Sequence, residues 1–321
     1  MAHYFKASHL QACLGLVIFA LALSSIRPIV ADYANPEAWQ GVVVPRTSQM
    51  LEAGLATCLS YGAIACYDFL AFAYVGYGLD RPTLRPKILF AGLLTYTISP
   101  NLGFAFLSGG AIRYRFYGRW GVPPLAIAQV ILFSNGTLWV GLCAVAGFTF
   151  WLEPIALPPA LTLPLDLAHL DRLCLGITAA YLCLCALGSR LRQWGSPWIR
   201  TQAQYLPTLA LAGGQILIFA LDWGFAALGL YSLLNLASVL SFGAFFGIYT
   251  LAMVAGLLST VPGGLGVLET VMLYFLTDVG LDPPFILGRL LVFRGIYYWL
   301  PLGLAIVALG IYELKTHHLK G

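Results

Sequence analysis

The sequence predicts an all-α, polytopic membrane protein with about eight transmembrane helices, and three observations lead to this fold class. Hydrophobic residues make up 60% of the 321 residues, and charged residues make up only 9%. A soluble globular chain carries about 25% charged residues, so most of this surface is expected to face lipid. The apolar residues also fall in runs near the length of about 20 residues that a membrane-spanning helix needs. We therefore expect residues 1–321 to form a single integral membrane domain.

The expected crossings alternate with short loops whose charges indicate their side of the membrane. The crossings are residues 10–31, 50–79, 122–151, 173–187, 205–230, 233–258, 259–277 and 285–312. Loops 80–87 and 188–200 and the tail 315–320 are basic, whereas loop 278–284 holds two acids and no base. Because lysine and arginine favour cytoplasmic loops, we predict that both termini lie in the cytoplasm of a bacterial inner membrane. The first crossing is interpreted as an uncleaved span because its apolar core is too long for a signal peptide.

The stretch 99–120 differs from an ordinary membrane helix because it combines helix breakers with positive charges. It contains, in order, Pro100, Asn101, the pair Gly109–Gly110, Arg113, Arg115 and Arg119. A full crossing from residue 88 to residue 107 would place the three arginines outside, against the positive-inside rule. We therefore predict a re-entrant hairpin that turns near residues 100–103 and returns to the cytoplasmic side. The alternative is a full span followed by a basic outer loop.

A second broken segment, at residues 259–266, resembles the first, at residues 99–110. In each, Ser or Ser-Thr precedes a proline, and the proline is followed by small or polar residues, Leu-Gly and an apolar residue. Paired broken segments in the two halves of a transporter point to a binding site near the middle of the bilayer. The pair therefore predicts an inverted repeat, and the alternative is a chance likeness between two proline-glycine breaks.

Five charged residues lie in or beside apolar runs, where a charge costs about 3 kcal/mol at a helix centre. They are Asp68, Arg113, Asp222, Glu269 and Arg294. Glu269 and Arg294 are expected to form an ion pair, which is either functional or serves only to lock adjacent helices. Asp68 has no evident partner in its own helix and ranks higher as a functional residue. Asp222 is interpreted as a residue at the membrane interface.

Four motifs stand in order along the chain. They are Asp68 after a tyrosine, the run Pro-Asn-Leu-Gly-Phe…Leu-Ser-Gly-Gly-Ala-Ile-Arg-Tyr-Arg (100–115), Pro-Gly-Gly-Leu-Gly-Val-Leu-Glu (262–269) and Phe-Arg-Gly-Ile-Tyr-Tyr-Trp-Leu-Pro (293–301). Together, over residues 60–304, they resemble the membrane half of the lysylphosphatidylglycerol flippase/synthase family (multiple peptide resistance factor) and related standalone membrane proteins. The resemblance implies flippase-type translocation of an anionic or aminoacylated phospholipid, with phosphatidylglycerol or its lysyl derivative as the lipid partner. No soluble synthase domain is expected in this sequence, so the candidate protein partners are a separate synthase chain and a second copy of this chain.

The same residues suggest how a charged lipid head group would be held. Arginines bind a phosphate through two hydrogen bonds at once, and carboxylates meet ammonium groups. A Gly-Gly turn lets backbone donors approach a phosphate closely. The predicted lipid-binding residues are Asp68, Asn101, Ser108, Gly109, Gly110, Arg113, Arg115, Pro262, Gly263, Gly264, Glu269 and Arg294.

Other classes of function need residues that can be looked for in the sequence. A secondary transporter of a small solute would use Asp68 or Glu269 to carry protons, and a non-catalytic scaffold would dock a separate lipid-modifying enzyme. An enzyme is disfavoured because the sequence has no Gly-x-Ser-x-Gly motif and no second protease aspartate motif. The five histidines lie at the termini or in a loop and the seven cysteines form no Cys-x-x-Cys pair, so no metal or other cofactor is expected. The basic residues lie mainly in loops, which argues against nucleic acid as a partner.

Overall fold

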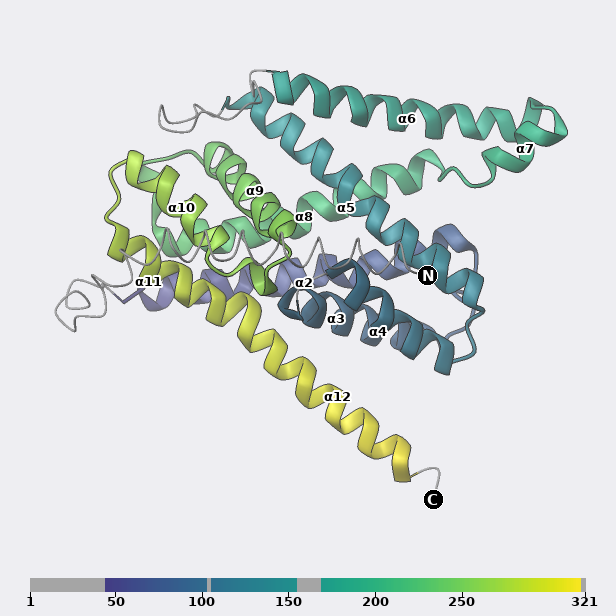
Figure 1. Cartoon of the computed structure of the whole chain (residues 1–321), viewed down its shortest axis with the longest axis horizontal. Coiled ribbons are helices and arrows are strands. Elements are labelled where there is room, and N and C mark those ends of the chain that lie inside the picture. Colours follow the sequence, from purple (N-terminus) through teal and green to yellow (C-terminus); the bar gives the residue numbers. More distant parts are fainter. Residues whose placement is uncertain (1–43, 103–104, 155–168, 319–321) are drawn as a thin grey trace, which may run out of the picture. The chain divides into compact units, whose positions relative to one another are not determined.

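The computed structural model describes residues 44–102, 105–154 and 169–318, and every regular element in these ranges is helical (Figure 1). The α-helices are α2 (Thr47–Val75), α3 (Arg85–Leu102), α4 (Ala105–Arg119), α5 (Pro124–Leu152), α6 (Leu170–Trp194), α7 (Pro197–Ala203), α8 (Leu209–Leu234), α9 (Phe242–Ser259), α10 (Val267–Asp278), α11 (Pro283–Arg294) and α12 (Leu300–His318). Between them lie the 3-10 turns η3 (Leu236–Ser238) and η4 (Pro262–Gly264) and the π-helical turn η5 (Gly295–Trp299). The predicted all-α fold class is confirmed.

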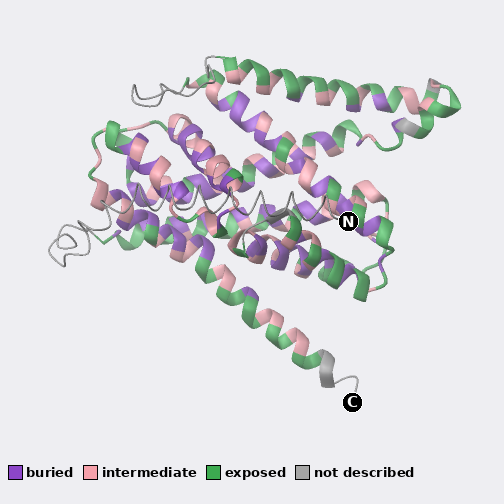
Figure 2. Ribbon diagram, in the orientation of Figure 1, coloured by how far each residue is buried: buried purple, intermediate pink, exposed green. Residues whose placement is uncertain are grey.

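Among the described residues, six helical segments are long and apolar enough to span a bilayer, so the protein is a polytopic membrane protein. They are Thr47–Val75, Pro124–Leu152, Leu170–Gln193, Leu209–Leu234, Phe242–Ser259 and Pro283–Lys315. Many large apolar side chains on these helices are exposed, among them Leu132 and Trp139 on α5 and Leu217 on α8 (Figure 2). Such apolar surface suits contact with lipid tails. The first predicted crossing, residues 10–31, lies outside the described residues.

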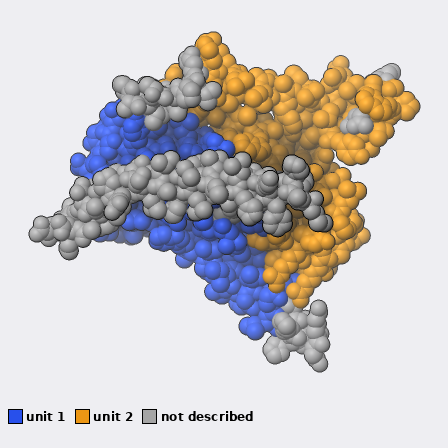
Figure 3. Space-filling model, in the orientation of Figure 1, with its two compact units in different colours: residues 1–57, 94–109, 226–321 blue, residues 58–93, 110–225 orange. Residues whose placement is uncertain are grey.

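The chain forms two compact units (Figure 3). The first consists of residues 1–57, 94–109 and 226–321, and the second of residues 58–93 and 110–225. In the first unit α10 packs against α9 and α11, and in the second α6 packs against α5. Helices α2, α3, α4 and α8 contribute residues to both units. The assignment of the whole chain to one membrane domain stays a prediction.

The predicted hairpin is formed by α3 and α4, which run in opposite directions. The ring of Phe90, near the start of α3, lies 5.8 Å from the ring of Phe116, near the end of α4. Lys87 Nζ likewise lies 5.8 Å from the centre of the Trp120 ring, just beyond α4. The chain therefore turns back between the two helices, as predicted. The depth of the hairpin in a membrane stays a prediction.

The break in this hairpin lies within the predicted stretch, since α3 ends at Leu102 and α4 begins at Ala105. Pro100 lies inside α3, and the pair Gly109–Gly110 lies inside α4, so neither forms the turn. Pro100 is tolerated in the last turn of α3, where the Ser99 hydroxyl and the Asn101 amide donate to backbone carbonyls four residues earlier. A Cβ at Gly110 would make only an ordinary contact, at 3.8 Å, with the Ile131 side chain on α5.

The second predicted break is confirmed, and it interrupts the crossing expected over residues 259–277. Helix α9 ends at Ser259, Thr260 is left-handed with φ 57°, and α10 begins only at Val267. With 12 residues α10 is about 18 Å long, too short for a hydrocarbon core of about 30 Å. The glycines at 263, 264 and 266 have positive φ and fold the chain so that α10 packs against α9. Helix α10 alone therefore does not span the hydrocarbon core, and the side of the membrane on which this segment ends stays a prediction.

The last apolar segment runs through α11, η5 and α12 without a gap. Pro301, the second residue of α12, has no N–H to donate to the carbonyl four residues earlier. The helix widens into the π-helical turn just before this proline, which is a common adjustment in such helices. The wide turn follows directly after Arg294, the last residue of α11.

Candidate functional site

Among the described residues, each unit buries one arginine–carboxylate pair between apolar helices. The Asp68 centre, in the second unit, consists of Asp68, Arg113 and Tyr117. The Glu269 centre, in the first unit, consists of Glu269, Arg294 and the turn at residues 262–264. Ionisable residues within membrane helices are rare and usually serve function. Both centres are therefore candidate functional sites.

The carboxylate of the Asp68 centre is fully enclosed, since 0% of Asp68 is exposed. Arg113 Nη2 donates to Asp68 Oδ1 at 2.7 Å, and Arg113 Nε lies 3.2 Å from Oδ1 and 3.1 Å from Oδ2. The Tyr117 hydroxyl donates to Oδ2. Asp68, which has no partner in its own helix, thus finds an arginine and a tyrosine on α4.

Three helices build this centre. Arg113 and Tyr117 are four residues apart on α4 and therefore project from one face. Gly92 lets α3 come close to α2, because a Cβ at this position would lie 3.4 Å from Asp68 Cβ and 3.6 Å from Oδ2. One turn after Asp68, the Phe72 ring packs edge-on against Tyr117 with centroids 4.9 Å apart. The ion pair is thereby enclosed by backbone and aromatic groups.

A second carboxylate in the same unit, Asp222, is also buried, with 7% exposed, and its predicted place at the membrane interface stays a prediction. Asp222 Oδ1 accepts from the Ser60 hydroxyl at 2.6 Å, and Oδ2 accepts from the Tyr67 hydroxyl at 3.2 Å. Ser60 and Tyr67 lie on α2 and Asp222 on α8, so these hydrogen bonds join the two helices. Within a membrane helix a carboxylate needs such donors because water is absent.

The Glu269 centre confirms the ion pair expected from the sequence. Arg294, which is 2% exposed, donates from Nη2 to Glu269 Oε2 at 2.9 Å and from Nε to Oε1. The Gly266 N–H donates to Glu269 Oε2 at 2.8 Å, so the same carboxylate also caps the start of α10. Removing this carboxylate would affect both the charge balance and the helix terminus.

The turn before α10 presents carbonyls to the arginine. Arg294 Nη1 donates to the Gly263 carbonyl at 2.7 Å, and Nη2 lies 3.3 Å from the Gly264 carbonyl. The N–H of Gly264 donates to the Val261 carbonyl at 2.9 Å, and the N–H of Leu265 to the Pro262 carbonyl at 3.2 Å. The expectation that this Gly-Gly turn offers backbone donors to a phosphate is therefore wrong for these two amides, which are used within the turn.

The two breaks that resemble each other in sequence meet in the first unit. A Cβ at Gly263 would lie 3.4 Å from Arg294 Nη1 and 3.9 Å from Asn101 Oδ1. Asn101 itself donates to the Thr97 carbonyl at 2.8 Å near the end of α3. The predicted residues Asn101, Gly263 and Arg294 are thus brought together, and the inverted repeat stays a prediction.

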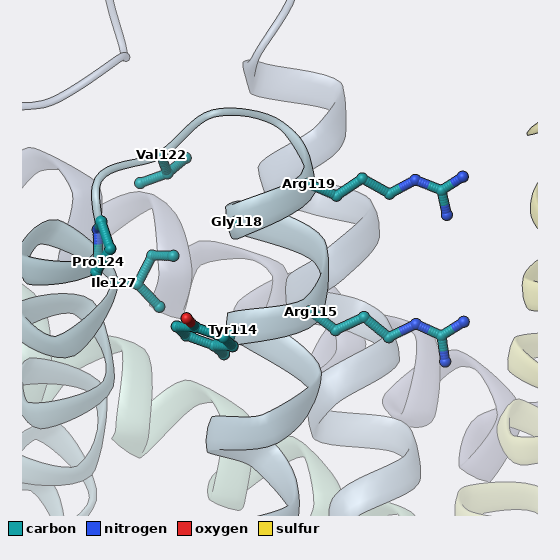
Figure 4. Close-up of a pocket in the computed structure, with 7 residues that line it drawn as sticks. All are labelled: Tyr114, Arg115, Gly118, Arg119, Val122, Pro124 and Ile127. Carbon is teal, nitrogen blue, oxygen red and sulfur yellow. The ribbon is translucent and has the colours of Figure 1, made fainter.

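Several other predicted residues lie outside both centres. Ser108 donates to the Ser99 carbonyl at 3.4 Å, and the pair Gly109–Gly110 is helical. Arg115 is exposed because it is two residues from Arg113 and points to a different side of α4. It lines a surface cavity of about 360 Å³ with residues that include Arg119 and Tyr114 (Figure 4). In Figure 4 both of these arginine side chains extend in the same direction from α4.

Two tyrosines of the centres were missed by the sequence reasoning. Tyr117 and Tyr298 each follow their arginine by four residues, in Arg113–Tyr117 and Arg294–Tyr298. The Arg294 guanidinium lies 5.4 Å from the centre of the Tyr298 ring, which is a cation–π distance. A repeated Arg-x-x-x-Tyr spacing is visible in the sequence and could have found both.

At each centre, a charged group of a ligand can replace one member of the buried ion pair. A carboxylate can accept an ammonium group in place of its arginine, and the arginine can bind an oxyanion in place of its carboxylate. In the part of the chain that the structure describes, no three His, Cys, Asp or Glu side chains are grouped so that they could hold a metal ion.

Comparison with known proteins finds partial likeness to one class of lipid-modifying enzyme. No family model matches the chain. Over 91 residues, or 28% of this chain and 11% of the relative, it is 33% identical to phosphatidylglycerol lysyltransferase of Staphylococcus epidermidis. This match is shorter than the stretch 60–304 along which the sequence resemblance was drawn, so it does not establish membership of the flippase/synthase family.

Two relatives match along most of their length. The inner membrane protein YbhN of Escherichia coli is 28% identical over 287 residues, which cover 88% of this chain and 86% of YbhN. The uncharacterized protein slr0712 of Synechocystis is 39% identical over 313 residues, which cover 95% of this chain and 92% of slr0712. This protein is therefore a multi-pass membrane protein that belongs to the family of Synechocystis slr0712.

Proposed function

We propose that this protein moves a phospholipid between the two leaflets of a bacterial inner membrane. The lipid would carry a phosphate in its head group and, in the preferred case, an ammonium group as in an aminoacylated phosphatidylglycerol. The observation that carries the proposal is the Glu269–Arg294 pair, which is buried in apolar helices directly beside a broken helix. Broken helices with charged residues at membrane depth are typical of transport sites.

The buried pairs favour a ligand that offers both charges. Opening the Glu269–Arg294 pair without a substitute leaves two buried charges unpaired, and breaking a buried pair costs about 3–5 kcal/mol. A head group with a phosphate and an ammonium supplies a new partner to Arg294 and to Glu269 at once. The same argument applies to Arg113 and Asp68. A zwitterionic or aminoacylated head group is therefore a better competitor than a simple anion.

The relatives support a link to lipids. The relatives that match part of this chain are named for the transfer of lysine to phosphatidylglycerol, and a membrane segment shared with them suits the same lipid. For this protein, action on the same lipid is a proposal. A separate synthase chain and a second copy of this chain are proposed as its protein partners. We also propose that both termini lie in the cytoplasm, because the basic residues of the loops support this orientation.

The proposal is tested by leaflet exchange in proteoliposomes. Purified full-chain protein is reconstituted with fluorescent lysylphosphatidylglycerol or fluorescent phosphatidylglycerol, and a membrane-impermeant quencher reports the outer leaflet over time. Wild type should raise the exchange rate several-fold above empty liposomes. Asp68→Asn and Glu269→Gln should return it to the background, because each leaves a buried arginine without its carboxylate.

Matched controls use exposed acids next to the tested ones. Asp278→Asn changes an exposed residue on the same short helix as Glu269, and Asp80→Asn changes an exposed residue in the loop after α2. Both controls should exchange lipid as wild type does. If folded wild-type protein leaves the exchange rate at the background for both lipids, lipid translocation is wrong. Proton-coupled transport of a small solute or scaffolding would then replace it.

A further inference from the structure

One end of the α3–α4 hairpin, in the second unit, carries exposed cations. Lys87 lies near the start of α3, and Arg115 and Arg119 lie in the last two turns of α4. All three side chains are exposed, whereas Arg113 of the Asp68 centre is buried. We call Lys87, Arg115 and Arg119 the basic surface, and it is distinct from the Asp68 centre.

Two aromatic rings of the α4 end connect the cation on α3 with those on α4. The Lys87 Nζ lies 5.8 Å from the centre of the Trp120 ring, and the Arg115 guanidinium carbon lies 5.9 Å from the centre of the Phe116 ring. The Phe116 and Trp120 rings are themselves 5.5 Å apart. The Phe90 ring on α3 also packs edge-on against Phe116, with centroids 5.8 Å apart. Lys87 and Arg115 therefore lie beside the same pair of rings.

The two arginines of the basic surface are placed to act together. Arg115 and Arg119 are four residues apart, so they project from one face of α4 with Cβ atoms about 6 Å apart. Their stems line the same surface cavity, and Figure 4 shows both side chains extended in the same direction from α4, away from Val122 and Ile127. The guanidinium groups therefore lie outside that cavity, one helical turn apart. Two guanidinium forks at this spacing suit the oxygens of one phosphate group.

The segments that carry the basic surface have an excess of positive charge. Residues 80–87 hold three basic residues and one acid, and α4 holds three arginines and no acid. Asp68 neutralises only Arg113 among these arginines by the ion pair described above. An excess of exposed positive charge attracts anions, and at a membrane surface it attracts anionic lipids.

The basic surface lies next to a membrane-spanning helix. Helix α5 begins at Pro124, five residues after Arg119, and its 29 residues make it about 43 Å long. A hydrocarbon core of about 30 Å is shorter than this helix, so the helix ends reach the layers of lipid head groups. Tryptophan, lysine and arginine are typical of these layers, as Trp120 and the basic surface are here.

Exposed apolar side chains favour a lipid over a soluble anion or an acidic protein as the ligand. Leu89 on α3 is 38% exposed, Tyr114 on α4 is 61% exposed and Leu125 on α5 is 73% exposed. Each lies within a few residues of the basic surface or of the start of α5. A ligand with both a phosphate and apolar tails matches cations that stand beside exposed apolar side chains.

We propose that the basic surface binds the phosphodiester of an anionic phospholipid in the leaflet next to it. Arg115 and Arg119 donate to the non-bridging phosphate oxygens, and Lys87 adds a positive charge beside them. This inference goes beyond the proposed translocation, because it requires binding at the membrane surface and involves neither buried ion pair.

The test measures lipid-induced stabilisation of the purified full chain in a nonionic detergent after removal of bound lipid. Thermal unfolding is followed during titration with phosphatidylglycerol, with phosphatidylethanolamine of the same acyl chains, and with inorganic phosphate. The variants replace Lys87, Arg115 and Arg119 by glutamine, singly and together, and a further variant is Arg115→Lys/Arg119→Lys. The matched control is Arg190→Gln, which removes an exposed arginine on α6. The titrations are repeated in the Glu269→Gln/Arg294→Met background, which lacks the buried Arg294.

Phosphatidylglycerol should stabilise the wild type at lower concentration than phosphatidylethanolamine does, in both backgrounds. Each single glutamine variant should raise the half-maximal concentration of phosphatidylglycerol about fivefold, and the triple variant about a hundredfold. Arg115→Lys/Arg119→Lys should raise it less than the corresponding pair of glutamines, because lysine keeps the charge but loses the fork. Arg190→Gln should leave it unchanged, and added salt should weaken the wild-type response through screening.

The triple variant should unfold near the wild-type temperature when no lipid is present, because the three side chains are exposed. A triple variant that responds to phosphatidylglycerol as the wild type does would overturn the proposal. An equal loss in Arg190→Gln would show an effect of net charge and would overturn it too. Equal stabilisation by phosphatidylethanolamine or by inorganic phosphate would overturn the assignment to an anionic lipid. Lipid exchange in proteoliposomes decides the proposed translocation separately, so the two failures can be told apart.

Discussion

Replacing Glu269 by glutamine tests how strongly the ion pair of the Glu269 centre holds the structure. Glu269 accepts two hydrogen bonds from Arg294 and one from the Gly266 N–H. In Glu269→Gln one carboxylate oxygen becomes an NH₂ group, so this donor faces the donors of the Arg294 guanidinium. Arg294, which is only 2% exposed, also loses the charge that compensated its own. Breaking a buried pair on one side costs about 3–5 kcal/mol, and we expect a loss of this size in the free energy of unfolding.

The double variant Glu269→Gln/Arg294→Met should be less damaging than the single variant. It removes both charges, so the main remaining loss is that of the hydrogen bonds from Arg294 to the carbonyls of Gly263 and Gly264. At about 1 kcal/mol for each hydrogen bond, the double variant should lose about 2 kcal/mol. If Arg294→Met alone also costs about 3–5 kcal/mol, the double-mutant cycle should give a coupling energy of about 4–8 kcal/mol between the two side chains.

The assay is reversible unfolding of the purified protein in detergent, followed by circular dichroism during denaturant titration. Asp278→Asn, on the same helix as Glu269 but exposed, controls for the loss of an acid in general and should change stability little. Additive effects of the two single substitutions would refute the reasoning, because independent side chains show no coupling. A stable double variant that still fails to exchange lipid would support a functional role of the pair in addition to its structural one.

Three more substitutions test the packing around the two centres. Tyr117→Phe removes the hydroxyl that donates to Asp68 and should cost about 1.5–3 kcal/mol in denaturant unfolding, whereas an unchanged midpoint would contradict the hydrogen bond. Gly92→Leu should destabilise the protein by about 1–3 kcal/mol, because the larger side chain overpacks against Asp68. Gly92→Ala should not destabilise it, because its Cβ only touches the Asp68 side chain. Equal effects of the two variants would refute the close approach of α3 to Asp68. Gly264→Ala should destabilise the protein by about 1 kcal/mol or more, because φ is 57° and the new Cβ would lie 3.2 Å from the backbone of α9. Gly303→Ala is the control: a Cβ at this position in α12 meets open space, so this variant should gain up to about 1 kcal/mol. A neutral Gly264→Ala would show that the turn is not strained by a side chain.

Part of the candidate site could be predicted from the sequence because helix breakers and buried charges act locally. The Glu269–Arg294 pair was expected since both residues lie in apolar runs and few other partners exist there. The break near residue 262 was expected because proline and successive glycines disfavour helix. The break near residue 100 was also expected, and α3 ends at Leu102, although Pro100 itself lies inside the last turn of the helix.

The partner of Asp68 could not be predicted in this way. Its arginine lies 45 residues away on α4, and several arginines stand close together in the sequence there. Only the rotation of α4 about its axis decides that Arg113 points to the carboxylate while Arg115 is exposed. The same rotation brings Tyr117 to Asp68, and nothing in the composition of the run indicates it.

By itself, the sequence determined that this is a helical membrane protein with two broken segments and charges among its apolar runs. Composition and run length settle these points because lipid admits only apolar surfaces and internally bonded backbone. The tertiary structure alone decided that α10 is a short helix packed between α9 and α11. It also decided that Glu269 neutralises Arg294, whereas Arg289 Nε and Nη1 have no hydrogen-bond partner among the described residues. The physical reason is that the partner of a buried charged side chain depends on which faces of distant helices pack together. The sequence of an apolar run does not determine this packing.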